Sequence, residues 1–363
     1  MPRPTLLDHR SPDSSRPLPR PAGVLRARAP LRVSFAGGGT DMPFYYAEHQ
    51  GAVLASTINR YTYVSLAPGS DHGAVSIASL DFDLMVKYRL DKKPAYDGVL
   101  DLAKAAIRRL VPADFPGGFD VYVQSDAPAG SGLGGSSSLT LALIGTLSGL
   151  LGTPLDRYQL AELAYEIERV DLAMKGGKQD QYGIAFGGFN FIEFSCKEIV
   201  VHPLRIDPGV LKDIECHLLL CYTGRTRLSA GVISRQEDFL RQGRPETLEG
   251  LERLRGLCYQ MKNALLREQL GDFAELLNEE WRHKVQANPH VTTPAIDEML
   301  AVARQQGAIG GKLLGAGAGG YLLLFCEVNR KRKVYEALEQ LGGQFMNFSF
   351  VDDGLTVWRS QCP

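Results

Sequence analysis

The chain has 363 residues, of which 44% are hydrophobic and 22% are charged, so it holds enough apolar material for one large or two ordinary globular domains. Forty basic side chains against 41 acidic ones leave a formal net charge of -1, which gives no global attraction to nucleic acid or to an anionic membrane. No stretch approaches the roughly 18 uninterrupted apolar residues of a membrane span. We therefore expect a soluble enzyme or binding protein, with two domains sharing a cleft and any anion held locally.

The first 22 residues differ in composition from the rest, being rich in proline and arginine without an apolar run long enough for a signal peptide. We predict a disordered arm over residues 1–23 and a cytoplasmic location. The six cysteines are scattered, with no Cys-x-x-Cys pair and no spacing suited to zinc, so we expect reduced thiols.

Alternating apolar and β-branched residues predict strands from Val24 to Leu66, interrupted by a glycine turn. The patterns that follow predict helices at 97–110, 136–151, 155–172, 229–242, 246–284 and 294–305, strands at 119–124, 189–194, 216–222, 308–314 and 321–328, and a last helix with two short strands. We expect a domain boundary between the strands at 189–194 and 216–222, which divides the chain into domains 24–205 and 206–363.

The segment from Gly130 to Ser138 is the strongest functional signal, because nearly all of its residues are glycine or serine and it joins a predicted strand to a predicted helix. Glycines let the backbone approach an anion closely, and the helix start presents free N–H groups with a partial positive charge. The serine hydroxyls at 136 to 138 can cap the helix, bind a metal, or both. A plain tight turn with a capped helix is the alternative.

The same segment contains the spacing Gly-x-Gly-x-x-Gly at Gly130, Gly132 and Gly135, which is typical of dinucleotide-binding folds. Such a fold requires a strand after the helix, ending in an acidic residue about 20 residues beyond the glycines, whereas a second helix is predicted here. No Gly-x-x-x-x-Gly-Lys-Ser/Thr loop occurs either. The context favours polyphosphate binding outside both of these folds.

The segment between Glu166 and Gly183 carries acids on a predicted helix, then a Gly-Gly turn with Lys175 and Lys178, then Asp180. A phosphoryl-transfer site needs a magnesium ligand, cations for the transition state and a group that orients the acceptor hydroxyl. This segment could supply all three. Solvated charges and a helix cap are the alternatives.

These motifs resemble those of the galactokinase, homoserine kinase, mevalonate kinase and phosphomevalonate kinase (GHMP) superfamily. Residues 128–138 are similar to its second motif, Pro-x-x-x-Gly-Leu-Gly-Ser-Ser-Ala, with Gly135 and Ser137 at the positions of the first Ser and the Ala. Residues 29–41 resemble the first motif and residues 312–320 the third. The resemblance implies an α+β fold of two domains with the active site in the cleft between them, and it implies ATP and Mg²⁺.

The resemblance also implies roles for individual residues. Asp180 would accept or orient the acceptor proton, and Arg32 and Lys178 would be catalytic cations. Ser136 and Glu168 would bind the metal, with Ser137, Ser138 and Glu166 as open alternatives. The implied ATP-binding residues are Pro128, Gly130, Gly132, Leu133, Gly134, Gly135, Ser136, Ser137 and Ser138, and the implied substrate-binding residues are Gly38, Gly39, Thr40, Asp41, Arg227, Gly317 and Gly319.

Residues 34–41, 178–182 and 222–224 are most similar to kinases of D-glycero-D-manno-heptose 7-phosphate. This implies transfer of the γ-phosphate of ATP to the anomeric C1 hydroxyl, and a second anion pocket for which Arg225, Arg227 and Lys284 are candidates. A GHMP kinase of an unphosphorylated sugar, of the fucokinase or galactokinase kind, is the alternative. A catalytically inactive GHMP-fold binding protein and an NAD-dependent oxidoreductase are less favoured, and the oligomeric state stays open.

Overall fold

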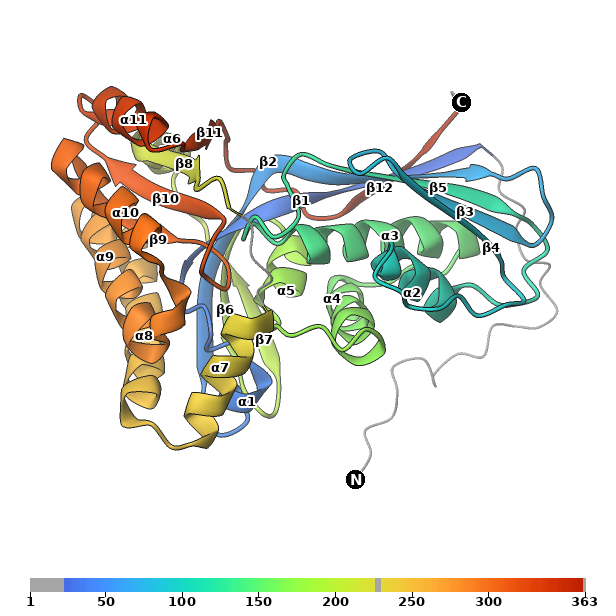
Figure 1. The fold of residues 1–363 in the computed structure, drawn as a ribbon, viewed down its shortest axis with the longest axis horizontal. Coiled ribbons are helices and arrows are strands. Elements are labelled where there is room, and N and C mark those ends of the chain that lie inside the picture. Colours follow the sequence, from blue (N-terminus) through green and yellow to red (C-terminus); the bar gives the residue numbers. More distant parts are fainter. Residues whose placement is uncertain (1–22, 226–229, 362–363) are drawn as a thin grey trace.

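The computed structural model describes residues 23–225 and 230–361, and two β-sheets organise this part of the chain (Figure 1). The larger sheet has the strand order β12-β1-β2-β5-β3-β4, with β6 paired to β2 and β7 paired to β6. Its strands are β1 (Val24–Ala36), β2 (Gly51–Pro68), β3 (Ala74–Ser79), β4 (Leu84–Arg89), β5 (Phe119–Ser125), β6 (Phe189–Phe194), β7 (Ile199–Pro203) and β12 (Thr356–Ser360).

Strand β2 is the longest in the larger sheet, with 18 residues. It pairs with β1 along most of its length, while residues 51–56 pair with β6 and residues 62–68 pair with β5. The described pairs of this sheet are antiparallel except for β3 and β5, which are parallel.

Helices cover one face of the larger sheet in Figure 1. The apolar helix α3 is central, because it contacts β1 and β2 as well as the neighbouring helices. The helices of this half are α1 (Pro43–Tyr46), α2 (Asp101–Leu110), α3 (Gly135–Leu151), α4 (Arg157–Glu166), the π-helix η1 (Ile167–Asp171) and α5 (Gln179–Phe186).

The smaller sheet has the strand order β11-β8-β10-β9, and helices α8 to α11 gather around it (Figure 1). Apolar residues of both sheets share one core, in which Phe35 of β1 packs against Phe273 of α9. The elements of this half are α6 (Pro208–His217), β8 (Leu218–Tyr222), α7 (Ala230–Arg241), α8 (Pro245–Leu266), α9 (Leu270–Ala287), η2 (Pro289–Val291), α10 (Pro294–Gln306), β9 (Ala308–Leu313), β10 (Tyr321–Cys326), α11 (Lys331–Gln340) and β11 (Gln344–Met346).

Most predicted elements are present, and the differences have local causes. The predicted helix over 246–284 is two helices, α8 and α9, separated by a turn in which Glu268 has a φ of 60°. The strand expected to begin at residue 216 begins at Leu218, because helix α6 continues to His217. The end of the predicted helix over 155–172 is the π-helix η1.

Strand β12 returns to the larger sheet, where it pairs with β1. The larger sheet, built mainly from the first half of the chain, therefore also contains a strand from the end of the chain, which the division near residue 205 did not anticipate. Within the described ranges no helix combines the length and the apolar character that a membrane crossing requires. Residues 1–22 of the predicted arm over 1–23, and the last two residues, lie outside the described part.

Candidate active site

A single polar cavity brings the three glycine-rich segments together with the segment around Asp180. Its walls come from β1 and the turn after it, the loop before α3, residues 168–180, helices α7 and α9, and the turn between β9 and β10. The cavity therefore lies between the two halves of the chain, as expected.

The glycine-rich loop before α3 leaves the start of this helix free. Gly134 occupies the N-cap position with a φ of 77°, and no side chain caps the helix. The serines thus differ from the expected capping role: the Ser137 hydroxyl donates to Glu168 and the Ser138 hydroxyl donates to the Ala29 carbonyl. Because the first N–H groups of α3 have no side-chain partner, they can bind phosphate oxygens.

The third glycine segment packs directly against this loop. A Cβ atom added to Gly132, whose φ is 82°, would lie 2.8 Å from the Leu314 carbonyl oxygen. A Cβ atom on Gly315 would lie 2.6 Å from the Cα atom of Gly132. The backbone amide of Tyr321 also donates to the carbonyl of Ser131. Glycine is required at this contact because two backbones meet with no room for a side chain.

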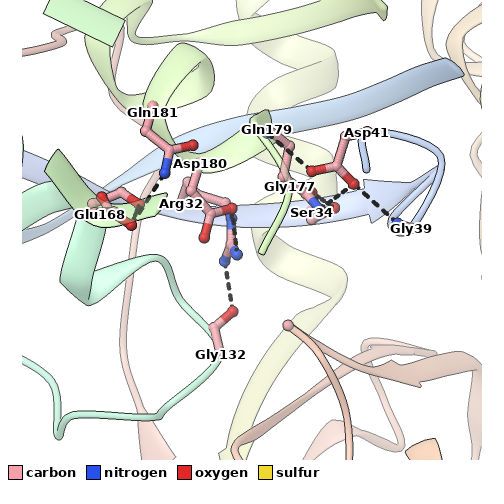
Figure 2. A network of polar contacts seen from close by, with 12 residues as sticks. Arg32, Ser34, Gly39, Asp41, Gly132, Glu168, Gly177, Gln179, Asp180 and Gln181 are labelled. Carbon is pink, nitrogen blue, oxygen red and sulfur yellow. Dashed lines mark hydrogen bonds and ion pairs between the residues drawn. The ribbon is translucent and has the colours of Figure 1, made fainter. Parts of the chain in front are cut away.

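Arg32 and Asp180, which both line the cavity, form an ion pair (Figure 2). The guanidinium group donates from Nε and Nη2 to Asp180 Oδ1, at 2.8 and 2.7 Å. Its Nη1 atom donates to the Gly132 carbonyl at 2.5 Å. Arg32 is buried, whereas 23% of the Asp180 side chain is exposed to the cavity side. Arg32 thus connects the Asp180 carboxylate to the glycine-rich loop before α3.

Asp41 is fully buried beside the first glycine turn. Its carboxylate accepts hydrogen bonds from the backbone amides of Gly39 and Gln179, both at 3.0 Å, and from the Gln179 side chain at 3.1 Å (Figure 2). Burial raises the pKa of Asp41, and the backbone hydrogen bonds act in the opposite direction. Gly177 packs so closely on this carboxylate that a Cβ atom there would overlap it, which explains the Gly-Gly turn.

Glu168 lies on the π-helix η1 and lines the cavity, although it is fully buried. One oxygen, Oε2, interacts with the Ser137 hydroxyl, the Gln181 amide and Arg169 Nη1 at 3.1 to 3.2 Å. The other oxygen, Oε1, has no hydrogen-bond partner among the described residues. Burial raises the pKa of Glu168. A buried carboxylate oxygen without a partner fits the needs of a hard divalent cation.

Ser136, at the start of α3, also lines the cavity. In the described part of the chain no group of three or more His, Cys, Asp or Glu side chains is arranged for a metal. One carboxylate, from Glu168, and one hydroxyl, from Ser136, suit Mg²⁺, which commonly binds one or two carboxylates together with substrate phosphates and water.

The structure brings most of the predicted site residues to the cavity, but not all of them. Lys178 donates to both carboxylate oxygens of Glu162, at 2.7 and 2.8 Å, and its ammonium lies 4.4 Å from the centre of the Tyr165 ring. Thr40 is buried and bonds to the backbone of Gly37 and Ala52. The predicted residues in the cavity wall are Arg32, Gly38, Gly39, Asp41, Gly130, Gly132, Gly134, Gly135, Ser136, Ser137, Glu168, Asp180, Gly317 and Gly319, whereas Pro128, Leu133, Ser138, Thr40 and Lys178 are outside it.

The candidates for a second anion pocket also separate. Of these candidates, Lys284 lines the cavity, Arg225 is exposed outside its wall, and Arg227 lies outside the described residues. Lys175, for which phosphate binding and a solvated charge were both left open, also lines the cavity. Sequence reasoning missed Arg169, Gln179, Ile233, Gln236 and Gly315. Gln179 could have been found from its position beside Asp180, but nothing in the helical pattern of α7 distinguishes Ile233 or Gln236 from ordinary packing residues.

Comparison with known proteins agrees with this geometry. Residues 101–188 match the family model for the GHMP kinases N terminal domain, and residues 261–345 match the model for GHMP kinases C terminal. The chain is similar to the D-glycero-alpha-D-manno-heptose 7-phosphate kinase of Campylobacter jejuni, with 37% identity over 340 residues that cover 93% of this chain and 99% of the relative.

Solved structures show the same similarity. The crystal structure of a D-glycero-D-manno-heptose 1-phosphate kinase from Bacteroides thetaiotaomicron has a TM-score of 0.77 and 33% identity, covering 93% of this chain and 99% of that one. The galactokinase of Lactococcus lactis complexed with galactose has a TM-score of 0.76, with coverages of 92% and 95%, but only 21% identity, so it supports the fold alone. Together with the glycine loops and the Arg32–Asp180 pair, these similarities show that the chain belongs to the GHMP kinase family and is a sugar kinase, a phosphotransferase with an alcohol group as acceptor.

Proposed function

We propose that this kinase transfers the γ-phosphate of ATP to the C1 hydroxyl of D-glycero-D-manno-heptose 7-phosphate and forms the 1,7-bisphosphate. The relative with 37% identity supports this acceptor by its name. The names of that relative and of the Bacteroides enzyme agree on the heptose and differ in the position of its phosphate. The similarity thus favours a heptose phosphate as the acceptor class, and the position is the part that needs an experiment.

The observation that carries the proposal is the connection of Asp180 through Arg32 to the Gly132 carbonyl. It places the carboxylate beside the loop whose helix start can bind the nucleotide phosphates. In the reaction the acceptor oxygen forms a bond to the γ-phosphorus while the bond from that phosphorus to the bridging oxygen of ADP breaks. Asp180 orients the acceptor hydroxyl and receives its proton, late in the transfer if the transition state is loose.

The metal part of the proposal rests on Glu168 and Ser136. Glu168 Oε1 has no protein partner in the described residues, and the Ser136 hydroxyl lies in the same wall, so both could hold Mg²⁺. When bound, Mg²⁺ would neutralise charge on the nucleotide phosphates. Arg169, which contacts Glu168 Oε2 at 3.2 Å, keeps this carboxylate oriented toward the cavity wall.

The acceptor end of the cavity lies beside Asp41, whose carboxylate can accept hydrogen bonds from sugar hydroxyls. Gln236 of α7 is only 9% exposed, and its side-chain amide has no hydrogen bond to another described residue. Its Nε2 atom lies 2.8 Å from the position of a Cβ atom on Gly39. This buried amide is available to a sugar hydroxyl. Lys175, which also lines the cavity, is about half-exposed and pairs with Glu237 of α7 at 3.2 Å. We assign it to the phosphate that the acceptor already carries.

The test is ADP release with Mg²⁺ and ATP over a panel of heptose 7-phosphate, heptose 1-phosphate, mannose, mannose 6-phosphate, galactose and fucose, followed by ³¹P NMR of the product. We expect fast turnover on heptose 7-phosphate and a new phosphate signal coupled to the anomeric proton. Turnover on heptose 1-phosphate, or on a free sugar, would keep the kinase chemistry and refute the acceptor. Tight NAD binding without ATP binding would refute the kinase proposal itself.

A further inference from the structure

Lys284 on helix α9 reaches the cavity from the second half of the chain. Its side chain is 8% exposed, and its ammonium donates to the Gly315 carbonyl at 2.6 Å. Since Gly315 packs directly on Gly132, this contact places the ammonium next to the loop before α3. Among the described residues no carboxylate lies within ion-pair distance of it.

The nearest acid on the same helix is occupied by another cation. Glu280, one turn earlier on α9, is fully buried and pairs with Lys312 of β9 at 2.9 Å. Lys312 also donates to the Phe35 carbonyl at 2.9 Å. An ammonium group has three N–H donors, so Lys284 keeps two of them without an acceptor in the described part of the chain. Burying a charged ammonium group with unused N–H donors costs free energy unless an anion binds next to it.

The protonation of Lys284 depends on burial and on the charged groups around it. The pKa of Lys284 is lowered to about 7, chiefly by burial and also by the nearby charges of Lys312 and Arg32, which outweigh the opposite effect of Glu280 and Asp41. The cations come from β9 and β1, and the acids come from α9 and the turn after β1. The free site thus disfavours the charged form of Lys284, and a phosphate group at the cavity wall would restore it.

We propose that Lys284 is a catalytic residue that binds the oxygens of the phosphoryl group during its transfer. This inference rests on the proposed kinase function and extends it. As the acceptor O–P bond forms and the bond to the bridging oxygen of ADP breaks, the electron pair stays on ADP and the proton goes to Asp180. The three remaining oxygens keep their negative charge throughout, and Lys284 neutralises it from the C-terminal half of the chain while Arg32 acts from β1.

A phosphate group could reach Lys284 from two sources, the nucleotide or the acceptor. The contact with Gly315, and through it with Gly132, favours the nucleotide phosphate, because Gly132 belongs to the loop before α3. Lys175 is the other lysine in the cavity wall, and the proposed function assigns it to the phosphate that the acceptor carries. The two sources predict different kinetics, since a cation for the transferred group changes kcat, whereas a cation for the acceptor's own phosphate changes the KM of phosphorylated acceptors only.

The experiment compares Lys284→Met and Lys284→Arg with wild type, and uses Lys312→Met as a control with an equally buried lysine. We expect Lys284→Met to lower kcat by about 10²-fold or more, with the KM of the acceptor changed less than about threefold, and Lys284→Arg to recover part of the activity. In wild type kcat/KM for ATP should fall as the pH rises through about 7, because Lys284 loses its proton. Lys284→Arg should remove this fall, whereas Lys312→Met should keep a fall and move it to higher pH, because the Lys312 charge lowers the pKa of Lys284.

Thermal stabilisation by a nonhydrolysable ATP analogue supplies a readout that does not depend on turnover. It should weaken above pH about 7 in wild type, and this weakening should be absent in Lys284→Met. A folded Lys284→Met enzyme with kcat within about threefold of wild type would overturn the inference, as would an effect confined to the KM of phosphorylated sugars. The proposed acceptor is judged separately by the wild-type panel, since the Lys284 comparison uses whichever sugar wild type phosphorylates, and the analogue measurement needs none.

Discussion

Replacement of Asp180 by Asn tests the centre of the site while changing its shape very little. Asn keeps an oxygen that can accept from Arg32 Nε, which now lies 2.8 Å from Asp180 Oδ1. It removes the negative charge and the ability to take a proton. A positioned general base contributes about 10²- to 10⁴-fold, which corresponds to about 3–5 kcal/mol of transition-state stabilisation. We expect kcat to fall by this factor.

Nucleotide binding should respond much less to this substitution. The start of α3 and the glycine loop do not depend on the Asp180 charge, and Arg32 keeps its hydrogen bond to the Gly132 carbonyl. We therefore expect the Kd of an ATP analogue to change less than about threefold, or under about 0.7 kcal/mol. ADP release at saturating substrates measures the first quantity, and equilibrium titration with the analogue measures the second.

Asp353→Asn is the matched control. Asp353 pairs with Arg28, which precedes Arg32 on the same strand, but the pair is 3.4 Å long and the Asp353 side chain is 60% exposed. An exposed ion pair contributes about 0–1 kcal/mol, so this variant should retain wild-type kcat. If Asp180→Asn kept more than about a tenth of kcat, Asp180 would not be the proton acceptor. A loss of analogue binding as large as the loss of kcat would instead give Asp180 a structural role in holding the loop.

Three other substitutions probe the metal ligand, the acceptor phosphate and the core. Glu168→Gln should raise the Mg²⁺ concentration for half-maximal activity by about tenfold or more, because the unpartnered oxygen loses its charge; an unchanged Mg²⁺ requirement would exclude Glu168 as a ligand. Lys175→Met should raise the KM of heptose 7-phosphate by about three- to tenfold and leave that of an unphosphorylated sugar unchanged, since a half-exposed cation contributes modestly. Lys312→Met leaves the buried Glu280 carboxylate unpaired, at a cost of about 3–5 kcal/mol. At about 2.1 cal/mol/K per residue this lowers Tm by about 4–7 °C in calorimetry, and an unchanged Tm would contradict the buried-pair argument.

The sequence was most informative where local chemistry determines the structure. Strand β6 begins and ends at the predicted residues, and helix α3 follows the glycine loop as expected. The family and the two-domain fold were predicted and confirmed, because glycine density and helix starts are local signals with a direct physical meaning. The return of β12 to β1 had no such signal, because strand pairing over hundreds of residues depends on the completed sheet.

Side-chain direction was less predictable than position. Lys178 and Asp180 are two residues apart at the start of α5, and each helical residue turns the side chain by about 100°, so the two leave the helix on nearly opposite sides. Asp180 faces the cavity and Lys178 faces Glu162. Gln236 was hidden for a related reason, because it lies on a helix whose pattern indicates packing. Lys284 was a candidate from the sequence, but only the assembly of the two halves shows that it meets the cavity.

One physical requirement, the close approach of main chains, explains why the segments around this site are rich in glycine. Gly132 and Gly315 meet backbone to backbone, the Arg32 amide donates to the Leu133 carbonyl, and the Tyr321 amide donates to the Ser131 carbonyl. Three stretches of main chain thus surround one small polar space, and a side chain at either glycine would separate them. The loop before α3 and the start of this helix offer backbone N–H groups to a phosphate but no charged side chain, so the charge of a transferred phosphoryl group has to be met by cations that reach the cavity from other elements. Arg32 is held by Asp180 and Gly132, whereas among the described residues the Lys284 ammonium donates to the Gly315 carbonyl alone, which leaves two of its N–H donors for a substrate oxygen.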